Sequence, residues 1–464
     1  MTPPDLTHVT SPLSYPDALA ALAARGRFGV RLGLERTRAL LDELGNPQAG
    51  IRGALVAGTN GKGSVLALAG SVLRQAGYRV GETPKPHLVT YRERLQIDGR
   101  PIEPDAFAAL LGELLPIADR VATTEGPPTE FELLTAMIFR WFAASAIDLA
   151  LVEVGLGGRL DATHAWDGGV AAVTNVALDH TDRLGHTIEA IAREKAAIIE
   201  PGDVAVTGAE EPALSIIRER ASAVGAPLTV AAPAAVVDLD RDGIVVELPS
   251  LGRSRVGLRG RHQAANVAVA DALLDALAEA GIAATVPEQR RIGYAAATWP
   301  GRLELIEGDR GPGGGRVEVL LDGAHNPAGA ATLAQALDDL RPYLTGGDES
   351  SPPQVTVVMS VMADKDVAGI VRELGSARCM ANASVICTRI DLSRALDPRE
   401  LASLWVAAWP ATTVSVEIGV DRAIDSALAR APGPVVVAGS LYLVGAVRAH
   451  LVDDPLLRDP VDGR

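Results

Sequence analysis

The chain has 464 residues, of which 48% are hydrophobic and 22% charged, a composition typical of a globular enzyme and not of a disordered chain. Its length predicts two or three domains rather than a single core. The formal net charge of -15 disfavours nucleic acid as a partner, because phosphate backbones need a basic surface, whereas a local field inside a cleft can still attract small anions.

Targeting and membrane signals are not evident in the sequence. The first residues, "MTPPDLTHVTSP", lack a charged start followed by an apolar stretch. The apolar run "PVVVAGSLYLVGAV" near the end is broken by glycines and is too short to span a bilayer. The two cysteines, Cys379 and Cys387, match no zinc pattern, which favours a reducing compartment. We therefore expect a cytoplasmic protein with neither a membrane nor a nucleic acid as partner.

Short β-rich runs alternate with longer helical patterns through the first two thirds of the chain. Buried strands are predicted for "GALVA" (53–57), "DLALVEVG" (148–155) and "GVAAVTNV" (169–176). Helices are predicted over 64–77, 129–142, 187–199 and 261–281, and a small antiparallel patch between about 232 and 258. This alternation predicts a mostly parallel sheet with helices on both faces.

A change of character near residue 300 indicates a domain boundary. Pro300 and Gly301 break the pattern, and a glycine-rich hairpin tip follows at 311–315. The alternation then resumes in "VEVLLDG", "QVTVVMSV", "ASVICTRI", "TTVSVEIG" and "GPVVVAGS". We predict an α/β protein with an N-terminal domain, residues 1–299, built on a mostly parallel P-loop-type sheet, and a smaller Rossmann-like α/β domain, residues 300–464. Ligands of such sheets bind at the carboxyl ends of the strands.

The stretch "VAGTNGKGSV" (56–65) follows the first predicted strand and resembles a loop that holds phosphate. The strict phosphate-loop spacing requires a glycine five positions before Gly61 and Ser or Thr directly after Lys62, where this chain has Val56 and Gly63. The alternative is a glycine-rich strand-to-helix turn with a chance lysine. The strand before the loop and the helix after it favour phosphate binding, because the helix N-terminus attracts anions.

Acidic and histidine side chains follow other predicted strands. Glu153 lies near the carboxyl end of a buried strand, where a charge needs a partner or a metal; a salt bridge to Arg159 is the simpler alternative. His180 follows the next strand, and a hydrogen-bonded loop histidine is the commoner case there. Mg²⁺ prefers oxygen ligands, so a histidine ligand would be unusual. Asp322 and His325 occupy a strand end in the second domain.

Lys195 is the least expected residue of the helix predicted over 187–199. The apolar stripe of this helix runs through Ile188, Ile191 and Ile198, and the spacing places Lys195 on the same face. A buried lysine tends to lose its proton. The alternative, which the residues alone favour, is a lysine that extends its ammonium group to water.

The helix predicted over 129–142 begins with a capping box. Thr129 is the expected cap, and Glu132 is its partner three residues later. This local role alone accounts for both side chains.

Taken together, these motifs closely resemble the folylpolyglutamate synthase family, often bifunctional as dihydrofolate synthase, within the Mur ligase superfamily. The match runs through nearly the whole chain. It covers "GRFGVRLGLER", "GTNGKGS", "TEFELLT", "EVGLGGRLDAT", "LDHTDRLGHTIEAIAREKAAII", "GRHQAANVAVA", "WPGRLE", "LLDGAHNP", "VMADKDV", "LSRAL" and "SLYLVGAVR". "GTNGKGS" is this family's own phosphate loop.

The resemblance implies an ATP-dependent ligase. ATP would phosphorylate a substrate carboxylate to an acyl phosphate, and the amine of L-glutamate would displace the phosphate to form an amide. Dihydropteroate or a reduced folate would be the acid, and the C-terminal domain would be the glutamate ligase domain. Mg²⁺, in two sites, and lysine would neutralise the anions that the transfer brings together. We also expect a monomer.

The resemblance further implies roles at individual positions. The implied ATP contacts are Thr59, Asn60, Gly61, Lys62, Gly63, Ser64, Asn266, Arg302, Asp322 and His325. The implied substrate contacts are Phe131, Glu132, Arg159, Leu160, Asp161 and Ala162. The implied metal ligands are Glu153, His180 and Lys195, the last as a carbamate. Among these, Lys62, His180 and Lys195 would act in catalysis.

One motif departs from the family pattern. The family typically has "TSPHL" where this chain has "PKPHL" (84–88), so that Lys85 replaces a serine that ligates metal. An ammonium group cannot ligate Mg²⁺, so we expect Lys85 to lie outside the metal's first shell and to face an anionic group; a solvated loop lysine without a role is the alternative. The departure leaves open a paralogous ligase that amidates a non-folate aromatic acid, and a non-catalytic nucleotide-binding protein is the other alternative.

Overall fold

The computed structural model describes residues 13–26, 32–311, 314–344 and 354–460. The N-terminal stretch, part of "GRFGVRLGLER" and the middle of the glycine-rich tip at 311–315 lie outside the described residues.

The chain forms two compact units. The first comprises Met1–Ala234, Ala265–Ala296 and Pro455–Arg464, and the second comprises Ala235–Ala264 and Ala297–Asp454. This grouping differs from the division predicted at residues 299 and 300. The antiparallel strands before 264 and residues 297–299 group with the C-terminal residues, and the chain's last residues group with the first unit.

An eight-stranded sheet forms the centre of the first unit, in the order β4-β3-β2-β5-β1-β6-β7-β8. Its strands are β1 (Gly53–Ala57), β2 (Val80–Thr83), β3 (Gln96–Ile97), β4 (Arg100–Pro101), β5 (Leu149–Glu153), β6 (Gly169–Val173), β7 (Val204–Thr207) and β8 (Leu228–Val230). The six neighbouring strands β2, β5, β1, β6, β7 and β8 are parallel. Strands β3 and β4 add an antiparallel edge next to β2. Both β1 and β5 are wholly buried, which explains their continuous apolar sequences.

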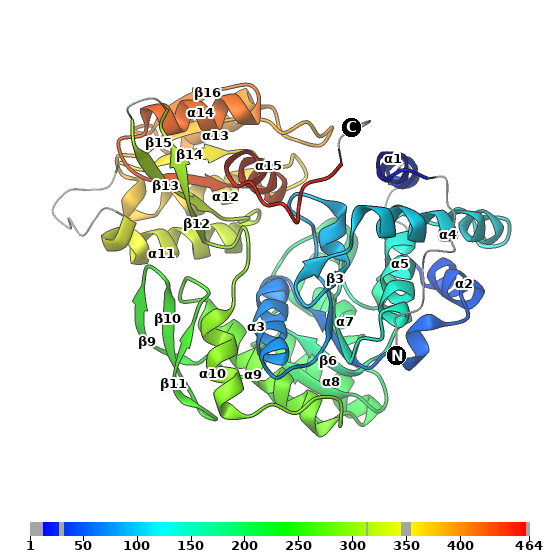
Figure 1. Ribbon diagram of the computed structural model, residues 1–464. Coiled ribbons are helices and arrows are strands. Elements are labelled where there is room, and N and C mark those ends of the chain that lie inside the picture. The colour runs from blue at the N-terminus through cyan, green and yellow to red at the C-terminus, as the bar shows by residue number, and fades with distance from the viewer. Residues whose placement is uncertain (1–12, 27–31, 312–313, 345–353, 461–464) are drawn as a thin grey trace. The chain divides into compact units, whose positions relative to one another are not determined.

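Helices cover both faces of this sheet (Figure 1). They are α1 (Tyr15–Gly26), α2 (Glu35–Glu43), α3 (Lys62–Gln75), α4 (Pro104–Ala122), α5 (Glu130–Ala144), α6 (Thr181–Leu184), α7 (Ile188–Ala196), α8 (Ala213–Val224), α9 (Gln263–Glu279) and α10 (Pro287–Ala296), with 3-10 turns η2 (Pro47–Gly50), η3 (Tyr91–Arg94) and η4 (Ala162–Ala165). On one face α3 packs on β1, β2 and β5 and is covered by α10, while α7 and α8 pack together on the other. Right-handed crossovers that run in opposite directions along the sheet, as they do in this strand order, place their helices on opposite faces.

The second unit contains two sheets. Strands β9 (Ala235–Asp240), β10 (Gly243–Leu248) and β11 (Gly252–Val256) form the small antiparallel patch that the sequence predicted. The larger sheet has the order β12-β13-β17-β14-β15-β16, parallel except for the β12–β13 hairpin. Its strands are β12 (Glu304–Asp309), β13 (Arg316–Leu321), β14 (Thr356–Met359), β15 (Ser384–Cys387), β16 (Thr413–Val416) and β17 (Val435–Ala438).

Helices flank the larger sheet of the second unit. They are α11 (Pro327–Leu344), α12 (Val367–Gly375), α13 (Pro398–Ala408), α14 (Val420–Arg430) and α15 (Leu441–Leu451), with the 3-10 turn η5 (Arg378–Met380). Helix α12 packs against α11 and α13, and α14 packs against α15 (Figure 1). The predicted α/β class, with a mostly parallel N-terminal sheet and a C-terminal sheet domain, is therefore confirmed. Within the described residues, none of the helices has the length and apolar character that crossing a bilayer requires.

Candidate active site

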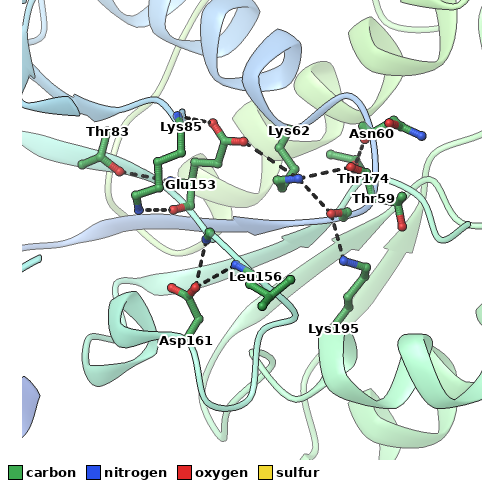
Figure 2. A network of polar contacts seen from close by, with 12 residues as sticks. Thr59, Asn60, Lys62, Thr83, Lys85, Glu153, Leu156, Asp161, Thr174 and Lys195 are labelled. Carbon is green, nitrogen blue, oxygen red and sulfur yellow. Dashed lines mark hydrogen bonds and ion pairs between the residues drawn. The ribbon is translucent and has the colours of Figure 1, made fainter. Parts of the chain in front are cut away.

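The candidate site lies at the carboxyl ends of three adjacent parallel strands of the first unit. Gly58 follows β1, Glu153 is the last residue of β5, and Thr174 follows β6. The strand register pairs Val56 of β1 with Glu153, so the residues just after β1 come level with that carboxylate. Figure 2 shows the resulting network of polar contacts. The predicted position of the site, at the strand ends, agrees with the usual ligand site of open α/β sheets.

The backbone of the loop between β1 and α3 requires its glycines. Gly58 has a φ of +150°, and a Cβ there would lie 1.9 Å from Thr174 Oγ1. Gly61 caps α3 with a φ of +82°, and a Cβ there would lie 2.2 Å from Asn266 Oδ1. Any larger side chain would therefore displace the loop from β6 or from α9.

Two residues after β6, which the sequence did not single out, hold this loop in place. The amide of Asn60 donates to Asn175 Oδ1 at 2.9 Å, and the amide of Thr59 donates to the Asn175 carbonyl at 3.0 Å. Thr174 Oγ1 donates to the Asn60 carbonyl at 2.6 Å (Figure 2). The sequence placed Thr174 and Asn175 inside the strand predicted over 169–176, whereas β6 ends at Val173, which leaves both residues free of the strand to bind the loop.

Lys62 folds back over its own loop. Its Nζ donates to the carbonyls of Gly58, at 3.0 Å, and Thr59, at 3.2 Å, and lies 3.9 Å from Glu153 Oε1 (Figure 2). The suggested salt bridge between Glu153 and Arg159 is wrong, because the Arg159 guanidinium instead donates to Glu194 Oε1 at 2.9 Å. Glu153 is thus paired with the lysine of the loop.

Lys195 points inward, as the stripe on its helix indicated. The residue is 4% exposed, and its Nζ donates to the Gly58 carbonyl at 3.0 Å (Figure 2). Burial, and to a smaller extent the charge of Lys62, lowers the pKa of Lys195 to about 7. The alternative in which Lys195 extends to water is therefore wrong. At neutral pH a substantial fraction of this side chain is a neutral amine.

Lys85 lies against Glu153 from the other side. Its amide donates to Glu153 Oε2 at 2.9 Å, and its Nζ donates to the Glu153 main-chain carbonyl (Figure 2). The ammonium group also lies 5.0 Å from the centroid of the Phe131 ring, a cation–π distance. Burial lowers the pKa of Lys85 to about 8. The alternative of a solvated loop lysine is therefore wrong.

His180 lies on the loop after β6. It caps α6 with a left-handed backbone, φ 49°, and its amide donates to Asp179 Oδ1 at 2.9 Å. Among the residues that the structure describes, no three His, Cys, Asp or Glu side chains are grouped so that they could hold a metal ion. Of the metal ligands that the resemblance implies, Glu153 and His180 remain predicted for one ion, and Lys195, as a carbamate, remains predicted for a second.

Several residues expected to contact substrate have local partners in the fold. Glu132 closes the predicted capping box with Thr129, whose amide donates to it at 2.7 Å, and it also accepts from Arg36 Nε at 2.9 and 3.0 Å. Asp161 accepts hydrogen bonds from the amides of Gly155, at 3.0 Å, and Leu156, at 2.8 Å. Phe131 and Leu160 are partly buried and Ala162 is buried.

Asp161 also binds the other end of its loop. Its Oδ1 accepts from the amide of Thr163 at 3.0 Å and from the Thr163 hydroxyl. The carboxylate therefore joins residues 155–156 to residue 163 and fixes the segment that follows Glu153.

In the second unit, the predicted residues cluster after β13. Asp322 accepts from the amides of Leu303, at 3.0 Å, and Ala324, at 2.9 Å. Burial raises the pKa of Asp322, and the charge of Arg302 opposes this shift. His325 Nδ1 lies 2.8 Å from the Gly323 carbonyl. The end of β13 and Leu303, the residue directly before β12, thus form one hydrogen-bonded corner.

Two family models match this chain: the Mur ligase middle domain at residues 56–274 and the dihydrofolate synthetase C-terminal domain at residues 311–450. A curated relative, the dihydrofolate synthase/folylpolyglutamate synthase of Bacillus subtilis, is 33% identical over 94% of this chain and 99% of its own length. The chain belongs to the folylpolyglutamate synthase/dihydrofolate synthase family. It is accordingly an enzyme of the ATP-dependent ligase class.

Solved structures of family members have the same fold. The folylpolyglutamate synthase of Mycobacterium tuberculosis, complexed with ADP and AMPPCP, is 33% identical, with a TM-score of 0.80 over 95% of this chain and 100% of that one. A bifunctional folylpolyglutamate synthase/dihydrofolate synthase with Mn, AMPPNP and L-glutamate bound is 29% identical, with a TM-score of 0.76 over 95% of this chain and 98% of that one.

We predict that Asp161→Asn lowers the free energy of unfolding by about 2 kcal/mol, because one amide NH₂ would then face backbone donors. Urea unfolding followed by circular dichroism measures the change. Asp182→Asn, whose side chain is 73% exposed, is the matched control and should stay within about 0.5 kcal/mol of the parent. Equal effects of the two substitutions would contradict the role assigned to Asp161.

Proposed function

We propose that this family member adds L-glutamate to the carboxylate of dihydropteroate, of a reduced folate or of both, at the expense of ATP. The observation that carries this proposal is the glycine loop whose lysine, Lys62, lies 3.9 Å from the buried carboxylate of Glu153 at the carboxyl edge of the sheet. We further propose that the enzyme acts in the cytoplasm as a monomer.

The loop between β1 and α3 would hold the phosphates of ATP. Its curled backbone and the N-terminus of α3 favour an anion, and Lys62 supplies a point charge. The proposed contacts run from Thr59 to Ser64 and include Asn266, which lies against Gly61. Arg302, Asp322 and His325 in the second unit stay predicted ATP contacts. A relative solved with AMPPCP supports a triphosphate as the ligand of this family.

The chain also offers groups suited to a divalent cation. The carboxylate of Glu153 is buried, and its Oε2 accepts a hydrogen bond from the Lys85 amide. Its Oε1 lies 3.9 Å from Lys62 Nζ, and a bound phosphate would interact with the same ammonium group. An ionised carboxylate next to a phosphate site is a typical Mg²⁺ environment. Glu153 and His180 would hold one Mg²⁺, and a carbamate on Lys195 would help to hold a second. A bound Mg²⁺ would neutralise charge on the phosphates during transfer.

The residues of this chain would act on two steps. In the first, a carboxylate oxygen of the acid attacks the γ-phosphorus of ATP, and the bond to ADP breaks. In the second, the amine of L-glutamate attacks the acyl carbon, and inorganic phosphate leaves with the electrons of the broken C–O bond. Lys62 would stabilise the charge on the phosphoryl oxygens through both steps, because it is fixed by two carbonyls of its own loop.

A second candidate function is amidation of a non-folate aromatic acid. It is favoured by Lys85, whose ammonium group lies over the ring of Phe131, a residue implied to contact the substrate. A cation at this ring would alter which acids the site accepts.

In the presence of Mg²⁺, the purified enzyme should release phosphate from ATP only when both L-glutamate and a folate-type acid are present. The assay compares dihydropteroate, tetrahydrofolate and a set of other aryl acids, with mass spectrometry of the amide product. We expect Lys62→Ala to lower turnover by at least about 100-fold, because it removes a charge that faces the phosphates. Arg218→Ala, an exposed cation of the same unit, is the control and should keep activity. Turnover with only a non-folate acid would favour the second candidate.

Lys85→Ser should tighten the apparent affinity for Mg²⁺ and weaken that for the acid substrate, each by roughly ten-fold. The serine would supply a hydroxyl ligand, and the ammonium group would be lost from the substrate side. Steady-state titrations of Mg²⁺ and of the acid test both effects, with Lys85→Arg as the variant that keeps the charge. Unchanged affinities for both would mean that Lys85 has no part in binding either.

We expect Lys195 to be carbamylated, because a buried amine with a pKa of about 7 is largely neutral above that pH and can react with CO₂. Carbon-13 NMR of enzyme equilibrated with ¹³C-bicarbonate should show a carbamate signal that grows between about pH 6 and 8. The signal should vanish in Lys195→Ala and persist in Arg218→Ala. A wild-type spectrum identical to that of Lys195→Ala would refute the modification.

A further inference from the structure

The last described residues, 455–460, group with the first unit, although the 158 residues before them, 297–454, belong to the second. We propose that this C-terminal segment positions the loop of residues 84–94, with Asp459 as the positioning residue. The loop contains Lys85, so the part of the proposal that concerns substrate rests on the proposed function.

Arg92 is the anchor of the segment. It is buried, and its Nη2 donates to the carbonyls of Leu456 and Arg458, both at 2.9 Å. Its Nε donates to Asp459 Oδ1 at 3.1 Å, while Nη1 donates to the Ile102 carbonyl at 3.1 Å. Three of these four acceptors come from the C-terminal segment. A buried guanidinium without them would be left with one acceptor, which is costly.

A second contact joins Asp459 to the start of the 3-10 turn η3. The Thr90 hydroxyl donates to Asp459 Oδ1 at 2.7 Å, and the same Thr90 oxygen accepts from the amide of Arg92 at 3.3 Å. The hydroxyl of Tyr15 lies 3.1 Å from it. One carboxylate oxygen of Asp459 therefore binds both the cap of η3 and the arginine two residues later.

From Thr90 the contacts continue toward the candidate site. Glu93 closes a capping box on Thr90 and accepts from the amides of Val89, at 2.7 Å, and Thr90, at 2.8 Å. Arg94 donates to His87 Nδ1 at 2.9 Å. These bonds fix the backbone between η3 and the "PKPHL" stretch.

The other end of the loop is held by the candidate site itself. The amide of Lys85 donates to Glu153 Oε2 at 2.9 Å. Residues 85–94 are thus tied to Glu153 at one end and to Asp459 at the other, and a looser Asp459 end would change how Lys85 is presented to Glu153 and Phe131. The geometry assigns to the C-terminal segment the orientation of this loop rather than contact with substrate.

The test is Asp459→Asn in the full chain, with hydrogen exchange read by mass spectrometry on ligand-free enzyme. We expect amides of residues 85–94 to exchange at least about ten-fold faster, because a charge-assisted bond to Arg92 is lost, while exchange in β1, β5 and β6 stays unchanged. In turnover assays, KM for the acid should rise by roughly ten-fold with KM for ATP within about two-fold. Asp459→Glu should restore in part both the slow exchange of residues 85–94 and the KM for the acid, since it keeps the charge.

Asp119→Asn is the matched control, because it removes an aspartate that pairs with Arg25 at 2.7 Å elsewhere in the same unit. It should alter neither local exchange nor the KM for the acid. Uniformly faster exchange across the first unit in Asp459→Asn would indicate a purely stabilising contact and overturn the proposal, as would unchanged exchange at 85–94. Faster local exchange with an unchanged KM would also overturn it. The exchange measurement needs no substrate, so it stands or falls independently of the proposed reaction.

Discussion

Two lysine side chains donate to one backbone oxygen at the centre of this enzyme. The carbonyl of Gly58 accepts from Lys62 Nζ and from Lys195 Nζ, each at 3.0 Å, and the nearby anion is Glu153. Two ammonium groups that share a partner repel one another, and burial makes this repulsion stronger than in water. Burial, and to a smaller extent the charge of Lys62, lowers the pKa of Lys195, and the positive charge of this corner favours the arrival of anions. The glycine loop, the strand register and the buried face of α7 all serve to bring these charges together.

Local patterns made much of this site predictable from the sequence. The capping box of Thr129 and Glu132 depends on residues three apart, and the inward direction of Lys195 depends on the 3.6-residue period of its helix, so both could be inferred without any tertiary information. The central strands were predictable because they are buried on both faces and are therefore continuously apolar. The sequence motifs indicated membership of the family, and the similarity to a relative over 94% of this chain and 99% of its own length confirmed that membership.

Partners that lie far apart in the sequence were not predictable. The pattern of apolar and polar residues around Arg159 does not indicate that this side chain binds Glu194 rather than Glu153. Nor does the pattern around Asn175 indicate that its side chain accepts from the amide of Asn60. The contact of residues 455–460 with Arg92 was unpredictable for the same reason. Two of the acceptors that this segment offers to Arg92 are the backbone carbonyls of Leu456 and Arg458, and a backbone carbonyl leaves no signal in the sequence. Such contacts depend on which segments the fold brings together, and hydrophobic periodicity contains no information about them.

The choice of lysine itself bears on function. Of the 43 lysines and arginines in the chain only four are lysines, and three of them, Lys62, Lys85 and Lys195, meet around Gly58 and Glu153. Arginine keeps its proton in proteins and spreads its charge over a wide plane, whereas lysine is a compact charge that can become a neutral amine when buried. A chain that uses arginine almost everywhere else therefore places lysine where compactness or loss of a proton matters. Lys85 is thus one of three lysines at the site, together with Lys62 and Lys195 of the quoted motifs. It contacts Glu153 through both its amide and its ammonium group. Lys85 stands where the resemblance implies a serine, and its contacts with Glu153 favour a requirement of the site over a neutral exchange of loop residues.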